Sequence, residues 1–85
     1  MTAKDYDADN KISEGLIKQY REQRQLAIDK VSAMYTERGL QIPKKVQDKL
    51  KTDLDNFDKQ ILEEQAKQIE NNRAKKGLRL THLQN

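Results

Sequence analysis

Two amphipathic stretches, joined by the short segment Arg38-Gly39-Leu40-Gln41-Ile42-Pro43, constrain the fold of this chain more than any other feature. In the first stretch, a series with steps of three or four positions is apolar except at Arg24, and its apolar members are Ile12, Leu16, Tyr20, Ala27, Val31 and Tyr35. The second stretch has a similar series that is apolar except at Gln65, with Val46, Leu50, Leu54, Phe57, Ile61 and Ile69. These spacings place the side chains on one side of a 3.6-residue helix. We therefore expect two long helices, over about residues 11–38 and 43–76.

The connection between the stretches predicts how the helices are arranged. Gly39 can adopt the left-handed conformation that ends a helix, and Leu40 is then placed to fold back on the last turn, as in a Schellman motif. Pro43 suits the first turn of the next helix, because its missing N–H would have no partner there. Only about four residues separate the helices, so they should be antiparallel neighbours. The predicted fold is an all-α antiparallel helical hairpin spanning residues 11–76.

Each terminus is expected to lie outside the hairpin. Residues 1–10 include three aspartates and are predicted to form an acidic N-terminal arm, with Asp9 or Asn10 as the N-cap of the first helix. Gly77 is expected to end the second helix. Residues 77–85 would then form a basic, leucine-bearing C-terminal arm.

The apolar content indicates a narrow core that is incomplete in one chain. Leu, Ile, Val and Phe total 18 of 85 residues, close to the composition of about 20% at which chains become disordered. The apolar faces are nevertheless wider than a seam between two helices can cover. We expect the hairpin to form a homodimer or higher oligomer, or to dock on another protein, and so complete a bundle. The helical face assigned to this contact consists of Ile17, Tyr20, Arg24, Ile28, Tyr35, Phe57, Leu62 and Ile69.

One charged residue lies within the first apolar face. Folding the hairpin about residues 40–41 places Arg24 opposite Phe57 and Asp58. Two interpretations follow. The Arg24 stem can lie across Phe57 while its guanidinium pairs with Asp58 at the edge of the seam. Alternatively, Arg24 sets the register or the choice of partner, as a polar residue in a helical seam can.

Residue types that carry catalysis are scarce. The chain has no cysteine, which excludes disulfides and cysteine-ligated zinc, and its one histidine, His82, lies near the end. The three glycines stand apart, so no glycine-rich phosphate loop exists. We therefore expect no enzyme, no catalytic or metal-binding residues, no cofactor and no small-molecule substrate.

No stretch approaches the roughly 20 apolar residues of a membrane span, and the start does not resemble a signal peptide. The expected location is the cytoplasm, or the inside of a larger particle such as a virion.

Positive charge gathers near the end of the chain. The residues assigned to a tail contact or to phosphate binding are Arg73, Lys75, Lys76, Leu78, Arg79, Leu80 and Leu83. The cations can bind phosphates, or they can complement the negative C-terminus of the helix. The leucines can dock as an extended segment on another protein.

These features favour a non-enzymatic assembly or adaptor protein that binds other chains through its helical faces and arms. A minor structural, scaffold or inhibitor protein of a phage or mobile element would suit this plan. The alternative is a small dimeric nucleic-acid-binding regulator that acts through residues 73–82. A salt-sensitive mobility shift with DNA or RNA would favour the regulator.

Overall fold

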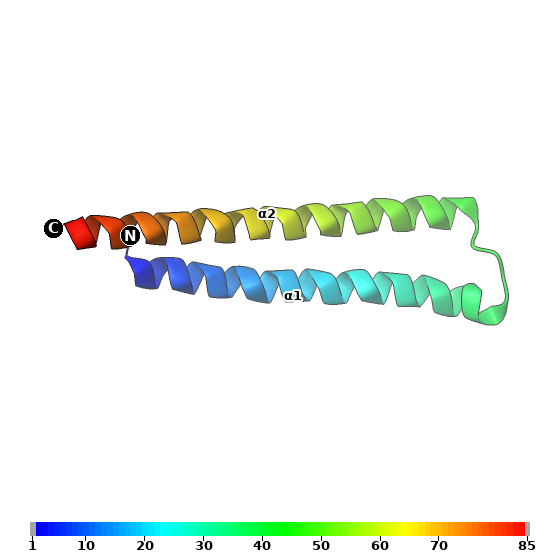
Figure 1. Cartoon of the computed structure of the whole chain (residues 1–85). Helices are drawn as coiled ribbons and strands as arrows, with labels where there is room; N and C mark the ends of the chain where they lie inside the picture. Colours follow the sequence, from blue (N-terminus) through cyan, green and yellow to red (C-terminus); the bar gives the residue numbers. More distant parts are fainter. Residues whose placement is uncertain (1, 85) are drawn as a thin grey trace.

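The chain forms an antiparallel hairpin of two long helices. The computed structural model describes the backbone of residues 2–84 and the side chains of residues 2–77. Helix α1 spans Ala3–Met34, a 3-10 turn η1 covers Thr36–Arg38, and helix α2 spans Lys44–Gln84. The helices lie side by side along their length, with both chain ends at one end of the hairpin and the connection at the other (Figure 1). The predicted all-α hairpin is confirmed.

The molecule is a thin rod. Its principal extents are 67 × 17 × 14 Å and its radius of gyration is 19.3 Å. A compact globule of this length would have a radius of gyration of about 12 Å. Because two helices side by side have no third layer to cover them, much of each helix surface faces solvent.

Helix α1 begins earlier than the sequence pattern suggested. It starts at Ala3, so the predicted N-terminal arm over residues 1–10 is wrong for the described part of that range. The cause is a capping box: the Thr2 Oγ1 accepts a hydrogen bond from the backbone N–H of Asp5, and the Thr2 N–H donates to the Asp5 carboxylate at 2.8 Å. The predicted N-cap at Asp9 or Asn10 is also wrong, because both residues lie inside the helix.

The first helical stretch ends at Gly39, as predicted, but its last turn is a 3-10 turn and not α-helix. Regular α-helix ends at Met34, and Tyr35 leaves helical geometry with φ −126° and ψ −67°. After the 3-10 turn, Gly39 adopts the left-handed conformation with φ 72° and ψ 17°. The Leu40 N–H donates to the Tyr35 carbonyl at 2.8 Å, and the Gly39 N–H donates to the Thr36 carbonyl at 3.0 Å. These two bonds are the Schellman pattern, so the predicted helix stop is confirmed.

Helix α2 is longer than expected. Pro43 immediately precedes it, and the Pro43 carbonyl accepts the first helical hydrogen bond from Gln47 N–H at 2.9 Å. The helix continues through Gly77, so this glycine does not end it and the predicted separate arm over 77–85 is wrong for residues 77–84. A glycine in a helix interior lowers stability by roughly 0.5–1 kcal/mol but does not break the hydrogen-bond ladder. The side chains of Leu78, Arg79, Leu80 and Leu83 lie outside the described residues.

The seam between the helices buries little apolar surface. Among the described residues, the buried hydrophobic side chains are Ile17 and Ile61, at 7% and 9% exposure. The other apolar seam positions, such as Leu50 and Phe57, are half-buried. Arg24 lies opposite Asp58, with its Nε 2.8 Å from the Asp58 Oδ1, as the predicted fold about residues 40–41 requires. The chain alone therefore forms a registered hairpin with a very small core.

Candidate interaction surfaces

The seam contains a buried polar pair. Ser13 is 2% exposed and Glu64 is 7% exposed, and the Ser13 hydroxyl donates to the Glu64 Oε2 at 2.8 Å. The other carboxylate oxygen accepts from the Lys67 ammonium at 3.1 Å. The hydrogen bond from Ser13, followed by that from Lys67, lowers the pKa of Glu64 below its ordinary value of 4.5. Glu64 is thus held ionised at a buried position in the seam, and each of its carboxylate oxygens accepts one hydrogen bond.

Polar contacts continue from this pair to the open end of the hairpin. The Asn71 amide donates to the Asp9 carboxylate at 2.7 Å and to the Asn10 side-chain oxygen at 3.0 Å. The Gln68 amide donates to the Asn10 backbone carbonyl at 3.3 Å. Lys75 forms an ion pair with Asp7. Hydrogen bonds and an ion pair therefore join the two helices from Ser13 to the open end of the hairpin.

Several large apolar side chains face solvent. They are Ile12, Leu26, Met34, Leu40, Leu62 and Ile69, each between 48% and 65% exposed. Leu62 and Ile69 are seven residues apart in α2 and share one face of that helix. They were among the residues assigned to partner binding, and they remain exposed. Among the described residues, these six exposed apolar side chains outnumber the two apolar side chains that are buried.

The other residues assigned to the helical face take several places. Ile17 is buried against α2 and belongs to the hairpin's own core. Half-buried positions along the seam are occupied by Tyr20, Arg24, Ile28, Tyr35 and Phe57. Arg24 forms the ion pair with Asp58, as the first of the two interpretations requires. The structure thus divides the predicted face between the seam and the surface.

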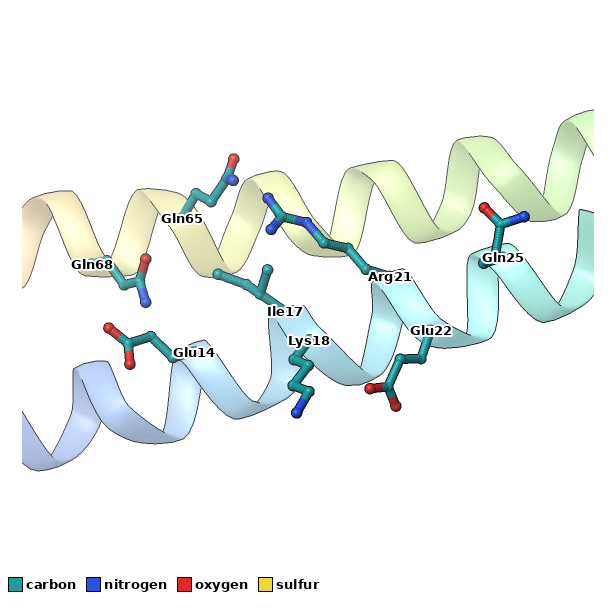
Figure 2. Close-up of a pocket in the computed structure, with 8 residues that line it drawn as sticks. All are labelled: Glu14, Ile17, Lys18, Arg21, Glu22, Gln25, Gln65 and Gln68. Carbon is teal, nitrogen blue, oxygen red and sulfur yellow. The ribbon is translucent and has the colours of Figure 1, made fainter.

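One groove along the seam is lined mainly by polar residues. Figure 2 shows Ile17 directed from α1 toward α2, with Arg21 beside it reaching toward the same helix. Lys18 and Glu22 point away from α2 in this view. Ile17 is the one apolar residue among the eight that line this groove, and the other seven carry charged or amide groups.

A second groove lies near the loop end, and we name it the loop-end groove. Its apolar residues come from both helices: Ala27, Val31 and Met34 from α1, and Val46 and Leu50 from α2. Its charged residues are Lys30, Lys45, Lys49 and Asp53. The sequence analysis did not predict this groove, although folding the hairpin about residues 40–41 also places Val31 opposite Leu50. Lysines flanking the apolar positions on both helices were the available signal.

The basic cluster near the C-terminal end is only partly accessible. Arg73 and Lys76 are exposed, whereas Lys75 is half-buried and paired with Asp7. This pairing removes one cation from the set that was assigned to phosphate binding. The side chain of Arg79 lies outside the described residues.

Neither a metal centre nor a membrane span is found in the described part of the chain. No group of three or more His, Asp or Glu side chains there is arranged to hold a metal ion. No helix in the same range is long and apolar enough to cross a bilayer. Comparison with protein-family models, with curated protein sequences and with solved structures finds no match to this chain.

Proposed function

We propose that this chain is a non-enzymatic interaction protein, an assembly or adaptor component that binds other protein chains through the sides of its hairpin. One observation carries the proposal: only Ile17 and Ile61 are buried among its described apolar side chains, while six large ones are exposed. Fully burying such a side chain is worth about 1.5–3 kcal/mol. A partner that covered several of them would add apolar burial to a seam in which most apolar side chains are only half-buried.

The shape of the molecule supports the same reading. A rod that is 67 Å long and 17 Å wide leaves the sides of each helix that face away from the seam open to a partner. Helical hairpins of this kind complete a core by adding helices from a second copy or from another protein. A role in a larger particle, including a phage particle, is compatible with this geometry.

The test combines oligomeric state with partner capture. Sedimentation of the pure chain from about 1 to 500 µM measures self-association, since assembly makes the folded population depend on concentration. The tagged chain is then used to capture proteins from its native host. The informative variant is Leu62→Ser with Ile69→Ser, and the matched control is Gln19→Ser with Gln23→Ser, which changes two exposed polar residues of α1.

We expect self-association or partner capture that the Leu62 and Ile69 substitutions weaken and the control leaves unchanged. The proposal fails if the chain sediments as a folded monomer throughout and captures no protein in a manner that depends on these side chains. Circular dichroism of each variant establishes that the helices are retained.

A further inference from the structure

We propose that the loop-end groove binds an acidic amphipathic helix of another protein. The inference rests on the proposed function, because it assigns a partner chemistry to one particular surface of the hairpin. The groove has two parts, and each selects a different property of the ligand. One is an apolar floor, and the other is a rim of lysines that stand on both helices.

The floor matches two turns of a helix. It runs from Ala27 to Met34 on α1, a stretch of eight residues that rises about 10 Å from the first to the last. Val46 and Leu50 line the opposite wall, one helical turn apart. A ligand helix of the same length presents apolar side chains at positions i, i+3 or i+4, and i+7. Met34 is 48% exposed, and its flexible thioether can adapt to different anchors.

The rim determines the charge of the ligand. Lys30 stands on α1, while Lys45 and Lys49 stand one turn apart on α2, and all three are exposed. Among the residues whose side chains are described, the ion pairs join Arg24 to Asp58, Lys67 to Glu64 and Lys75 to Asp7. The rim lysines therefore have no carboxylate partner within that part of the chain. Asp53 is the one acidic residue lining the groove, which leaves the groove positively charged.

Charge argues against a second copy of this chain as the occupant. If two copies met groove to groove, the rim lysines of one copy would face those of the other, and like charges in contact disfavour association. The acidic residues at the start of α1 are already engaged. Asp5 caps the helix with Thr2, Asp7 pairs with Lys75, and Asp9 accepts a hydrogen bond from Asn71. Neither groove-to-groove pairing nor the start of α1 suits the rim, and we therefore place the carboxylates that fit it on another protein.

The two parts of the groove contribute differently to binding. Apolar contact with the floor supplies most of the affinity, and the lysine stems extend that floor while their ammonium groups remain in water. Exposed ion pairs contribute little each, but they set the orientation of the ligand and reject partners of the wrong charge. The complex should therefore be specific for acidic helices and sensitive to salt.

The experiment uses two synthetic probes against the full chain. The first is a fluorescein-labelled helical peptide with leucines at i, i+3 and i+7 and glutamates beside them. The second is the same peptide with lysine in place of each glutamate. Fluorescence anisotropy measures the affinity of each probe at low and at moderate salt. We expect the acidic probe to bind at least about tenfold more tightly than the basic one, with the difference shrinking as salt rises.

Charge reversal locates the binding site. Lys45→Glu with Lys49→Glu should weaken the acidic probe at least about tenfold and should strengthen the basic probe. The matched control, Lys51→Glu with Lys59→Glu, makes the same charge change at exposed lysines of the same helix that do not line the groove. It should change the affinity of either probe less than about threefold. Met34→Gln should weaken the acidic probe without altering the preference between the probes.

Three results would overturn the assignment. First, the two probes could bind equally. Second, the control variant could weaken binding of the acidic probe as much as the rim variant does. Third, the chain could bind phosphatidylserine vesicles or duplex DNA but not the peptide, and Lys45→Glu with Lys49→Glu could abolish that binding. If the peptide fails while capture through Leu62 and Ile69 persists, the groove assignment falls and the proposed function stands. If neither binding is found, both fall.

Discussion

Removing the Ser13 hydroxyl should be the most destructive conservative change in the seam. Ser13 is 2% exposed, Glu64 is 7% exposed, and their oxygens are 2.8 Å apart. A hydrogen bond to a charged group contributes about 1.5–3 kcal/mol, and a buried acceptor left without a donor incurs the full desolvation penalty. Ser13→Ala should therefore lower the free energy of unfolding by about 1.5–3 kcal/mol. In a chain with so small a core this is a large fraction of the total stability.

A double-mutant cycle identifies the cause of that loss. Glu64→Met removes the charge, and the Ser13 hydroxyl can then donate to a carbonyl in the preceding turn of its own helix. The combination of Ser13→Ala with Glu64→Met leaves an apolar seam of similar volume, so it should be more stable than Ser13→Ala alone. The expected coupling between the two sites is at least about 1 kcal/mol.

Urea unfolding followed by circular dichroism at pH 7 measures each variant, at one fixed protein concentration. Ser32→Ala is the matched control, because Ser32 lies in the same helix and makes no side-chain hydrogen bond to a described residue. Both serine substitutions gain the same few tenths of a kcal/mol of helix propensity, which cancels between them. A Ser13→Ala variant whose free energy of unfolding lies within about 0.5 kcal/mol of the parent chain would show that this hydrogen bond does not stabilise the seam.

Three further outcomes follow from local geometry. Gly39→Ala should destabilise the chain by about 1–2 kcal/mol in urea unfolding, because φ at this position is +72°. Gly15→Ala should instead stabilise it by about 0.5–1 kcal/mol, because Gly15 lies in a helix interior with open space around it. The lowered pKa of Glu64 contributes stability that is present above the ordinary pKa of 4.5 and is lost as the pH falls through the folded-state pKa. Glu64→Gln should therefore flatten the acid limb of a plot of unfolding free energy against pH. An unchanged acid limb would contradict this. Arg24→Leu should change the unfolding free energy by less than about 1 kcal/mol, because the side chains of Arg24 and Asp58 are 35% and 48% exposed. A changed oligomeric mass in sedimentation would show instead that Arg24 sets the register.

The elements that were predicted well depend on local chemistry. Gly39 ends the first helical stretch because the left-handed conformation carries no steric penalty for glycine. The pairing of Arg24 with Asp58 followed from the hairpin's length and from the position of its turn. Predicting the helix stop and this pairing required only the backbone preferences of a few residues and the rise per residue of a helix.

The helix ends were less predictable, for reasons that are also local. Thr2 and Asp5 form the capping box that starts α1, and the threonine with an acidic residue three positions later was a readable signal that the aspartates at 7 and 9 obscured. Gly77 resembles a helix stop in the sequence, yet α2 continues past it. A glycine permits a helix to end, but it does not require it to.

Local sequence is enough to predict the period of the apolar residues, the turn and the antiparallel pairing that the turn enforces. The rotation of each helix about its own axis depends instead on contacts between the two helices, and it is visible only in the folded hairpin. That rotation turned Ile17 and Ile61 into the core, brought Ser13 onto Glu64, and left Leu62 and Ile69 in solvent. The rotation is not set locally, because a 3.6-residue period places the apolar side chains on a face about a third of the helix wide. Contact with the other helix then selects which part of that face is buried.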